Sequence, residues 1–439
     1  MKTHAWPNGY NFLQSLWRTY KQVKDPIGSM EESMARFNDT YAVNLGRTRM
    51  IATQDPRFIE YVLKTNHKNY HKSRILTEQL GRFLGNGLLT SNGEYWLRQR
   101  RLIQPGFHHD KIQSLFGIMK RTVDDFLNCF PVGEQVDVYP LMNRLAFQIV
   151  INTLFNVSIE PETRDALSSF ITETQDFVIR DIRQPHKSWW FALSGEVQRN
   201  LNRSQEARNI VRSIIHQRKE SGKNFDDLLN MLLDARYEDS GEAMSEEQVI
   251  DEILILLIAG HETTANALSW SMYLLANHPH EMEKLRSATQ GLNIRECVSH
   301  PRLLAVIHES MRLYPPAWIS DRVSLADDGF DHFTFPKDTI IILFYYGLHR
   351  HPRYWENPDS FIPDRFLKQE KDKPKTYFPF GGGPRLCIGN NFAMAEMALF
   401  LQETIQRFGI EPTGIAPVIR PLVTLRPDRV VLRISNLNG

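Results

Sequence analysis

The longest uninterrupted helical pattern in the sequence lies between Ser245 and Pro279. Ser245 with Gln248 three residues later is a capping-box signature for the start of a helix. No proline follows until Pro279, which predicts about 31 helical residues, roughly 46 Å at 1.5 Å per residue. The centre of this stretch is apolar, so we expect a helix that crosses a whole domain through its core.

Shorter patterns on either side predict a mainly α fold with small β-sheets beside it. Residues 41–64 are typical of two short strands followed by a helix, and residues from about 94 to 234 have mostly helical periodicity. The segment Ser188–Leu193 follows a proline and breaks that periodicity, which predicts a loop between two helices. After residue 314, β-branched runs and turn prolines predict strands. No linker or repeat divides the sequence, so we expect one domain over residues 1–439.

Composition argues against several classes of function. The 52 Lys and Arg residues nearly balance the 51 Asp and Glu residues, so net charge does not indicate a nucleic acid or an anionic membrane as partner. Three scattered cysteines are too few for a disulfide framework or a zinc site and favour a reducing compartment. The longest apolar run, residues 253–260, is too short to span a bilayer of about 30 Å. We therefore expect a cytoplasmic protein without a signal peptide or membrane anchor.

A glycine-rich segment precedes the last cysteine. Residues 378–390 read FPFGGGPRLCIGN and are followed by a helical pattern. Glycines let a backbone approach a flat ligand closely, and a helix N-terminus favours the thiolate form of a nearby cysteine. The segment therefore predicts a reactive thiolate at Cys387, with a free structural cysteine as the alternative.

The spacing of this segment resembles the haem-binding loop of the cytochromes P450. Five residues carry that resemblance, namely Phe380, Gly383, Arg385, Cys387 and Gly389. The resemblance covers residues from about 40 to 435 and implies the cytochrome P450 fold, with haem b between the long central helix and the cysteine loop. It implies that Cys387, the metal ligand, holds the haem iron, and that Phe380, Arg385 and Gly389 help to bind the cofactor. The implied activity is that of a monooxygenase, which uses O2 and two electrons to oxidise a C–H bond of a small organic substrate.

Inside the long helical stretch, residues 259–264 read AGHETT. A mid-helix glycine costs about 1 kcal/mol, and a threonine hydroxyl can bend a helix, although a packing glycine is the simpler explanation. By the resemblance, Glu262 and Thr263 are the catalytic acid–alcohol pair that relays protons for O–O cleavage, and Ala259 faces the substrate.

Two further motifs support the same family. Glu309 and Arg312 lie three residues apart on one helical face, and the resemblance implies that Arg365 in FIPDRF joins them. We expect this triad to have a structural role and to fix the loop that carries the cysteine.

The other motif is Trp96-Leu97-Arg98-Gln99-Arg100. Its i,i+4 spacing places the indole N–H of Trp96 and the guanidinium of Arg100 on one face. Haem propionates are carboxylates and prefer such donors. By the resemblance, Trp96, Arg100, Arg322 and Arg385 bind the propionates, with a surface ion pair as the alternative for Arg322.

The sequence constrains the substrate less than it constrains the cofactor or the reaction. By analogy, residues 174–192 and 316–320 line the pocket, and they contain Arg180, Arg183, Trp189, Trp190 and Trp318. Indole faces and guanidinium donors suit a polar ring, which predicts oxidative O-demethylation of a methoxylated sugar or aromatic substrate. If these charges are instead an exposed helix face and the tryptophans its packing, hydroxylation of a fatty acid, terpenoid or other lipid stays open.

The electron supply is expected to come from other proteins. The sequence ends at residue 439, 52 residues past Cys387, so we expect no fused reductase but a ferredoxin or flavodoxin with its reductase. Arg98, Arg100 and Arg101 form a candidate docking surface, with a solvated helix face as the alternative. A peroxide-driven thiolate-haem enzyme and a haem sensor are the other classes that the sequence leaves open, and the Glu262–Thr263 pair argues against the first.

Overall fold

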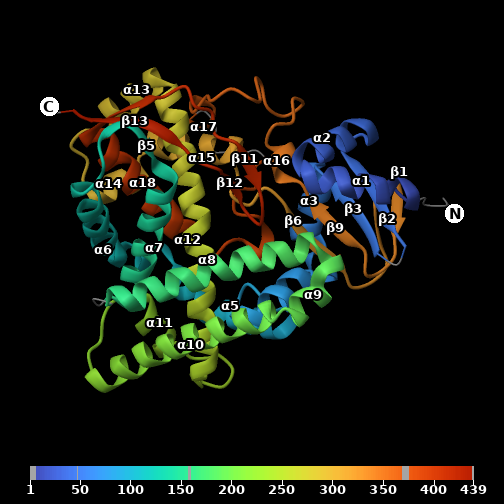
Figure 1. The fold of residues 1–439 in the computed structure, drawn as a ribbon, viewed down its shortest axis with the longest axis horizontal. Helices are drawn as coiled ribbons and strands as arrows, with labels where there is room; N and C mark the ends of the chain where they lie inside the picture. The colour runs from blue at the N-terminus through green and yellow to red at the C-terminus, as the bar shows by residue number, and fades with distance from the viewer. Residues whose placement is uncertain (1–5, 47, 157–159, 368–374, 438–439) are drawn as a thin grey trace. The chain divides into compact units, whose positions relative to one another are not determined.

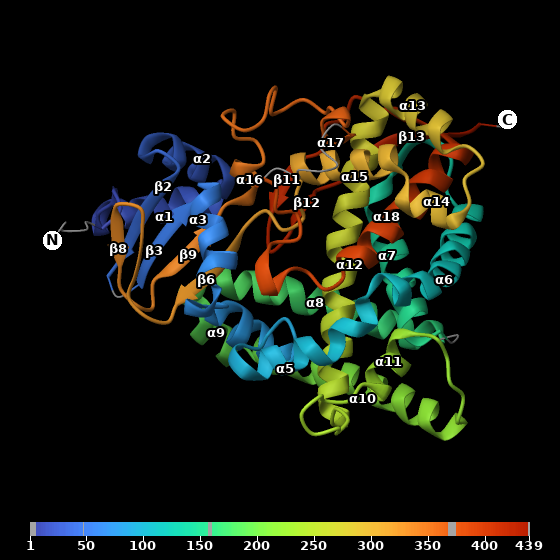
Figure 2. The same cartoon turned by 180° about the vertical axis from the view of Figure 1, so that it is seen from behind.

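The computed structural model describes residues 6–46, 48–156, 160–367 and 375–437. It is mainly helical with small sheets (Figures 1 and 2), as the sequence predicts. The chain forms two compact units, each built from separate stretches of sequence. Unit 1 comprises Met1–Ser73, His308–Cys387 and Ile419–Arg426, and unit 2 comprises Arg74–Ile307, Ile388–Val418 and Pro427–Gly439.

A six-stranded sheet with the strand order β1-β2-β3-β9-β6-β4 dominates unit 1. Its strands are β1 (Gly9–Tyr10), β2 (Thr40–Leu45), β3 (Thr48–Thr53), β9 (Ile340–Leu343), β6 (Ser320–Ser324) and β4 (Tyr70–His71). Strands β2 and β3 form an antiparallel hairpin, and β9 runs parallel to β3, with Met50 opposite Ile340. In β9, Ile341 and Leu343 are buried while Ile340 and Ile342 are half-buried, which is the period of two expected of a strand. The β2–β3 hairpin and the following helix confirm the prediction for residues 41–64.

Short helices and two small hairpins complete unit 1. The helices are α1 (Phe12–Lys24), α2 (Pro26–Phe37), α3 (Pro56–Glu60), α16 (Tyr345–Leu348) and α17 (Asp364–Leu367), with η1 (Tyr61–Thr65), η2 (His67–Asn69) and η6 (Gly383–Arg385). The hairpins are β7 (Asp328–Phe330) with β8 (Phe333–Phe335), and β11 (Ile419–Pro421) with β12 (Leu425–Pro427). Helix α15 (Pro301–Leu313) begins in unit 2 and ends in unit 1.

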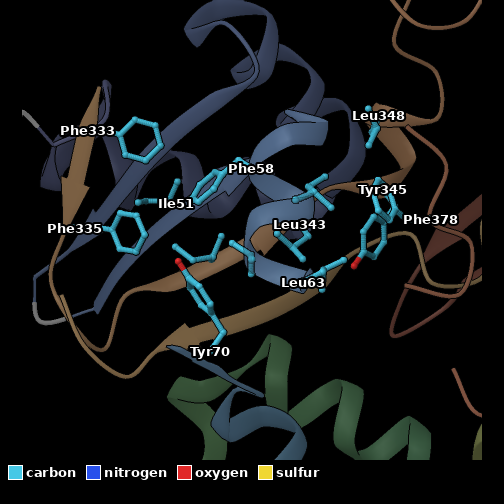
Figure 3. Packing of buried hydrophobic residues seen from close by; sticks show 13 residues of the cluster. Ile51, Phe58, Leu63, Tyr70, Phe333, Phe335, Leu343, Tyr345, Leu348 and Phe378 are labelled. Carbon is cyan, nitrogen blue, oxygen red and sulfur yellow. The ribbon is translucent and has the colours of Figure 1, made fainter. Parts of the chain in front are cut away.

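One buried hydrophobic cluster of unit 1 lies between the sheet and helix α3. Figure 3 shows the ring of Phe58, from α3, near Ile51 of β3 and near the rings of Phe333 and Phe335. The Phe58 and Phe333 ring centroids are 5.5 Å apart in an edge-on arrangement, which is favourable for aromatic rings. The same cluster extends to Tyr345 and Phe378, so the chain just before the cysteine loop is anchored in a packed core.

Unit 2 is a helical bundle around α12 (Glu246–Asn277). The capping box of Ser245 and Gln248 starts α12, and 32 residues follow before the helix ends at Asn277, which confirms the predicted long helix. Helix α7 packs along α12 (Figure 1). The other helices of unit 2 are η3 (Ile75–Leu80), α4 (Gly81–Leu84), α5 (Gly93–Ile103), η4 (Gln104–Phe107), α6 (His109–Asn128), α7 (Val138–Phe155), α8 (Pro161–Arg183), η5 (Pro185–Lys187), α9 (Ser188–Leu193), α10 (Glu196–Ser221), α11 (Leu228–Asp234), α13 (Pro279–Thr289), α14 (Ile294–Ser299) and α18 (Asn390–Arg407).

A three-stranded antiparallel sheet in the order β10-β13-β5 lies in the same unit. Its strands are β10 (Phe408–Pro412), β13 (Val431–Asn436) and β5 (Gly133–Asp137). One local prediction is wrong: Ser188–Leu193 forms the short helix α9 rather than a loop, because Phe191 packs into the core against Phe177 of α8. Across the described residues, the helices are all too short or too polar to cross a membrane.

Candidate functional site

The cysteine loop is held in shape by its own backbone and by η1. The Cys387 amide donates to the Phe380 carbonyl (3.0 Å) and the Leu386 amide to the Gly383 carbonyl (3.0 Å). Gly383 has φ +65°, and a Cβ there would lie 1.9 Å from the Leu63 carbonyl oxygen. The loop therefore requires glycine at position 383 for close backbone approach.

Cys387 differs from the other two cysteines in its surroundings. All three cysteines are in the described part of the chain, none of them is in a disulfide, and the Cys387 residue is exposed. Burial raises the pKa of the Cys297 thiol to about 12, and this thiol donates to the Ala398 carbonyl (3.6 Å), so Cys297 stays protonated. Cys129 is exposed after the end of α6, outside any glycine-rich loop. Of the three, Cys387 is the one that combines exposure with a glycine-rich loop.

Positive charge gathers near the cysteine loop. Burial, together with the charge of Arg322, lowers the pKa of the Arg385 guanidinium to about 10. Burial also lowers the pKa of His71, and the charge of Arg385 adds to this effect. A carboxylate placed here would be attracted by the guanidinium groups of Arg322 and Arg385. His71 was not predicted from the sequence, because its neighbour Arg385 is more than 300 residues away along the chain.

The structure brings Glu309, Arg312 and Arg365 together. Glu309 accepts from Arg312 through both carboxylate oxygens (2.7 and 2.8 Å) and from Arg365 Nε (3.0 Å), and both Glu309 and Arg312 are fully buried. Arg312 also donates to the carbonyls of His349, Pro358 and Ser360. The triad thus ties the end of α15 to the segment around residues 349–365.

Helix α12 has one narrow accessible stripe. It lies entirely within the described residues, and between Val249 and Met272 all side chains are buried except those of Leu256, Ala259, Gly260 and Thr263. Their spacing of three, four and seven residues places them on one face. The stripe is aliphatic apart from the Thr263 hydroxyl. Leu256 was not singled out from the sequence, although its spacing from Gly260 could have indicated it.

Glu262 and Thr263, the predicted acid–alcohol pair, lie on two faces of α12. Thr263 Oγ1 donates to the Ala259 carbonyl (2.8 Å), and Glu262 is buried beside it. The neighbouring His261 is buried against the Phe147 ring of α7, and burial lowers its pKa to about 4, although a hydrogen bond with the Asn143 backbone opposes this. His261 is therefore neutral at physiological pH.

On α5, Trp96 and Arg100 lie one turn apart, as their spacing predicts. Trp96 is buried, and Arg100 Nε donates to Gln104 (3.1 Å). The guanidinium of Arg98 pairs with Asp239 (3.0 Å) and lies 4.0 Å from the Tyr237 ring centroid, while Arg101 is exposed.

The side chains that the sequence predicts as a polar substrate lining lie in other surroundings. Arg180 pairs with Glu196 (2.7 Å), and Trp189 and Trp190 are 64% and 51% exposed. Trp318 is buried in the core of unit 1, where its indole nitrogen donates to the Leu422 carbonyl (3.0 Å). Arg183 is in α8, but its side chain lies outside the described residues.

Within unit 1, an exposed cysteine in a glycine loop and the half-buried Arg322 and Arg385 form a donor set suited to a thiolate-bound haem. The family model "Cytochrome P450" matches residues 5–432, and the chain belongs to this family. It is therefore a cytochrome P450 monooxygenase that uses haem b and O2, and enzymes of this family take electrons from redox partners.

Similar proteins come from distant sources. Cyclooctat-9-en-7-ol 5-monooxygenase of Streptomyces melanosporofaciens is 28% identical, over 87% of this chain and 84% of that protein. Cytochrome P450 4A7 of Oryctolagus cuniculus is also 28% identical, over 90% of this chain and 82% of that protein. The solved haem domain of cytochrome P450DA has the same fold, with a TM-score of 0.86 at 22% identity over 98% of this chain and 97% of that one.

The residues present fit haem. In unit 1, Cys387 offers an exposed thiol, and Arg322 and Arg385 form a cationic pair suited to propionates. In unit 2, small side chains at Ala259 and Gly260 leave α12 flat on its open stripe. Each unit thus carries a donor set or a surface with the chemistry that a haem requires.

Proposed function

We propose that this monooxygenase hydroxylates an apolar substrate of terpenoid or fatty-acid type. The observation that carries the proposal is the open stripe of α12, because three of its four residues present only carbon and hydrogen side chains, or none. A cavity lined in this way stabilises a hydrocarbon by about 25 cal/mol per Å² of buried apolar area and offers a polar ring few partners. The name of the cyclooctat-9-en-7-ol 5-monooxygenase, a similar protein, supports a substrate of this type.

O-demethylation of a methoxylated sugar or aromatic substrate is the second candidate. It depended on Arg180, Trp189, Trp190 and Trp318 as a polar lining. Arg180 is neutralised by Glu196 and the indole of Trp318 already donates to Leu422, so these groups give little support to a polar pocket. Trp189 and Trp190 are exposed, so their contact with such a substrate can be tested by substitution.

In the proposed mechanism, Cys387 holds the haem, and the haem supplies the activation of O2. Trp96, Arg100, Arg322 and Arg385 bind its propionates, while Phe380 and Gly389 complete the loop around the thiolate. Leu256 and Ala259 exclude water and position the substrate C–H bond. Thr263 holds a proton at Oγ1 on the open stripe, and the Glu262 carboxyl, on another face of α12, replenishes that proton through water. We also propose that the electrons come from a ferredoxin or flavodoxin with its reductase.

The first experiment is an optical titration of the purified ferric holoenzyme with two panels of compounds. One panel contains terpenoid alcohols and fatty acids, and the other contains methoxylated sugars and aromatics. We expect only the apolar panel to shift the spectrum from low to high spin, because a ligand then displaces water from the iron. Shifts by the methoxylated panel alone would overturn the proposal in favour of demethylation.

Matched variants locate the lining. Leu256→Ser should weaken the apparent affinity for the apolar ligand about tenfold, since a buried leucine contributes roughly 1.5–3 kcal/mol. Trp190→Ser, which removes an exposed apolar side chain of α9, should leave that affinity unchanged. The reverse pattern would contradict the assignment of the α12 stripe.

The role of Thr263 has its own test. Thr263→Ala should release more peroxide per NAD(P)H oxidised and form less product, whereas Thr263→Ser, which keeps the hydroxyl, should restore coupling. Unchanged coupling in Thr263→Ala would contradict the proton role and favour peroxide-driven chemistry.

A further inference from the structure

Helix α18 buries a carboxyl group that has no partner among the residues that the structure describes. Glu396 lies in the first half of this helix and is fully buried. Neither of its carboxyl oxygens is hydrogen-bonded to a described residue. Its neighbours along the helix, residue 395 and residues 397–401, are all buried and apolar. Buried polar groups in folded proteins nearly always have hydrogen-bond partners, so Glu396 requires a physical explanation.

A second carboxylate of the same helix has the opposite surroundings. Glu403 pairs with Lys120 of α6 (3.2 Å) and with Arg407 (2.7 Å). Lys120 and Arg407 also both pair with Asp124 of α6. The two cations of this cluster are therefore engaged by carboxylates other than Glu396. Glu403 thus serves as a matched comparison, an acid on α18 that has its counter-charges.

The elements that pack most closely against α18 are α6, α12, α13, α14 and β10. The titratable groups that reach α18 from α13 and α14 bind its backbone: Arg286 donates to the Ile405 carbonyl (2.8 Å) and Cys297 to the Ala398 carbonyl (3.6 Å). On α12, His261 packs against Phe147 of α7 and is followed by the buried Glu262, and on β10 Glu411 pairs with Arg433 (3.1 Å). Burial alone raises the pKa of Glu396 well above its ordinary value of 4.5, and no charge on these elements contributes.

A carboxyl group in such a site keeps its proton. Ionised, Glu396 would have neither a cation nor a hydrogen-bond donor among the described residues, and a buried group of this kind becomes neutral instead. In the unfolded chain the same side chain is in water and ionises above its ordinary pKa of 4.5. Folding therefore takes up one proton at Glu396 wherever the pH lies between these two pKa values. The stability of the fold must then fall as the pH rises through this interval.

We propose that Glu396 is a pH-sensitive switch in helix α18, which stays packed while the carboxyl is protonated and separates from its neighbours when the proton is lost at alkaline pH. Helix α18 begins at Asn390, three residues after Cys387. Separation of the helix therefore also releases the C-terminal end of the cysteine loop. The switch does not depend on which substrate the enzyme oxidises.

The first test is urea unfolding of the holoenzyme over a series of pH values between 5.5 and 8.5. The ratio of the unfolding constants of the wild type and Glu396→Gln should rise about tenfold per pH unit, because the glutamine cannot take up the proton. Glu396→Met, which keeps the length of the side chain without its polar group, should be more stable than the wild type throughout. For Glu403→Gln, the same ratio should stay constant over the series, since Glu403 is paired with Lys120 and Arg407.

Infrared difference spectroscopy of the folded holoenzyme at pH 7 detects the proton itself. The spectrum of the wild type minus that of Glu396→Gln should contain the C=O stretch of a protonated carboxyl group. The corresponding difference for Glu403→Gln should contain carboxylate bands instead. Carboxylate bands in the Glu396 difference would show that the group is ionised in the fold and would overturn the proposal.

The connection to the cysteine loop has a separate measurement. After incubation at pH 9.5, Glu396→Met should retain roughly twice the fraction of protein that shows the thiolate-bound spectrum of the reduced CO complex, compared with the wild type. Equal loss in the two proteins would overturn the part of the proposal that links α18 to the cysteine. An unfolding-constant ratio for Glu396→Gln that is the same at every pH would overturn the switch as a whole.

Discussion

Arg312 satisfies all five of its N–H donors inside the protein. Two contacts go to Glu309 and three to backbone carbonyls, and the guanidinium also lies 5.1 Å from the Trp355 ring centroid. Taking two charges out of water is costly, so the pair contributes little net stability against an apolar replacement. The pair instead fixes the local geometry, because the three backbone carbonyls that Arg312 binds cannot move independently of one another.

Breaking this pair should therefore be far more damaging than its net contribution suggests. In Glu309→Gln the Arg312 charge stays buried without its counter-charge, and we expect the free energy of unfolding to fall by about 3–5 kcal/mol. Urea unfolding of the holoenzyme measures this loss. Arg57→Gln removes an exposed pair with Asp55, whose arginine is 68% exposed, and should cost less than about 1 kcal/mol. Equal losses in both variants would contradict the structural role of the triad.

Asp328, which is half-buried, makes a second set of connections that no sequence pattern indicated. Its carboxylate accepts from the hydroxyls of Tyr61 (2.8 Å) and Tyr70 (2.6 Å) and from the amides of Asn66 (2.8 Å) and Asn69 (3.0 Å). Burial alone would raise the pKa of Asp328, but these hydrogen bonds outweigh burial and hold the pKa below its ordinary value of 3.8. The donors are more than 250 residues away in the sequence, so local reasoning could not find the cluster.

The lowered pKa of Asp328 predicts a direction for the pH dependence. A carboxyl with a depressed folded pKa contributes stability that is full above its unfolded pKa and disappears as the pH falls through the folded pKa. Asp328→Asn should lower the free energy of unfolding by roughly 1 kcal/mol at pH 7, since solvent screens a half-exposed carboxylate, and this deficit should shrink below pH 3.8. Urea titrations of the wild type and the variant at pH 7 and below pH 3.8 measure this deficit in unfolding free energy. A deficit that grows on acidification would show that the sign is wrong.

At the scale of elements, the cysteine loop shows which glycines are required. Gly381 and Gly383 both have positive φ, +72° and +65°. A Cβ at Gly381 would meet nothing within 4 Å, whereas a Cβ at Gly383 would overlap the Leu63 carbonyl oxygen at 1.9 Å. Both positions therefore carry backbone strain, but only Gly383 lacks room for a side chain.

This difference predicts unequal effects on haem binding. Gly383→Ala must push η6 away from η1 and should at least halve the fraction of protein that shows the thiolate-bound spectrum of the reduced CO complex. Gly381→Ala carries only the conformational cost of about 1–2 kcal/mol and should retain most of its haem. Similar haem content in the two variants would mean that the Leu63 contact yields easily.

Elements with a local signal were predictable, and those fixed by tertiary contacts were not. The capping box of Ser245 and the following proline-free stretch sufficed for α12. The same reasoning missed α9, since six residues after a proline carry little periodicity and its helix depends on Phe191 packing against Phe177. It could not place the side chain of Arg180 either, because the partner that neutralises it, Glu196, lies beyond a turn on α10.

The cysteine and acid–alcohol motifs indicated the cofactor and the reaction, but not the substrate. The thiol of Cys387 and the hydroxyl of Thr263 are specified by short motifs, the first in the loop after η6 and the second on α12. The substrate lining depends on which residues of many elements stay accessible. On α12 that set includes Leu256, which belongs to no motif. The single domain over residues 1–439 stays a prediction.

For the whole molecule, the near balance of 52 basic and 51 acidic residues means that a redox partner cannot be steered by net charge. Steering then depends on local charge, and the basic face of α5 is a candidate. Arg98 is already paired with Asp239, so the exposed Arg101 should contribute more to an incoming acidic surface.

Arg101→Gln should therefore raise the KM for an acidic ferredoxin about threefold to tenfold at low ionic strength without changing kcat at saturating ferredoxin. The difference should nearly vanish in 1 M salt, where the Debye length falls to about 3 Å and screens charges on the surface. Steady-state reduction assays over a salt series measure both quantities. Lys223→Gln removes the same charge from an exposed position just after α10 and should leave the KM unchanged at every salt concentration. Equal effects of the two variants would mean that only overall charge matters and that α5 is a solvated face.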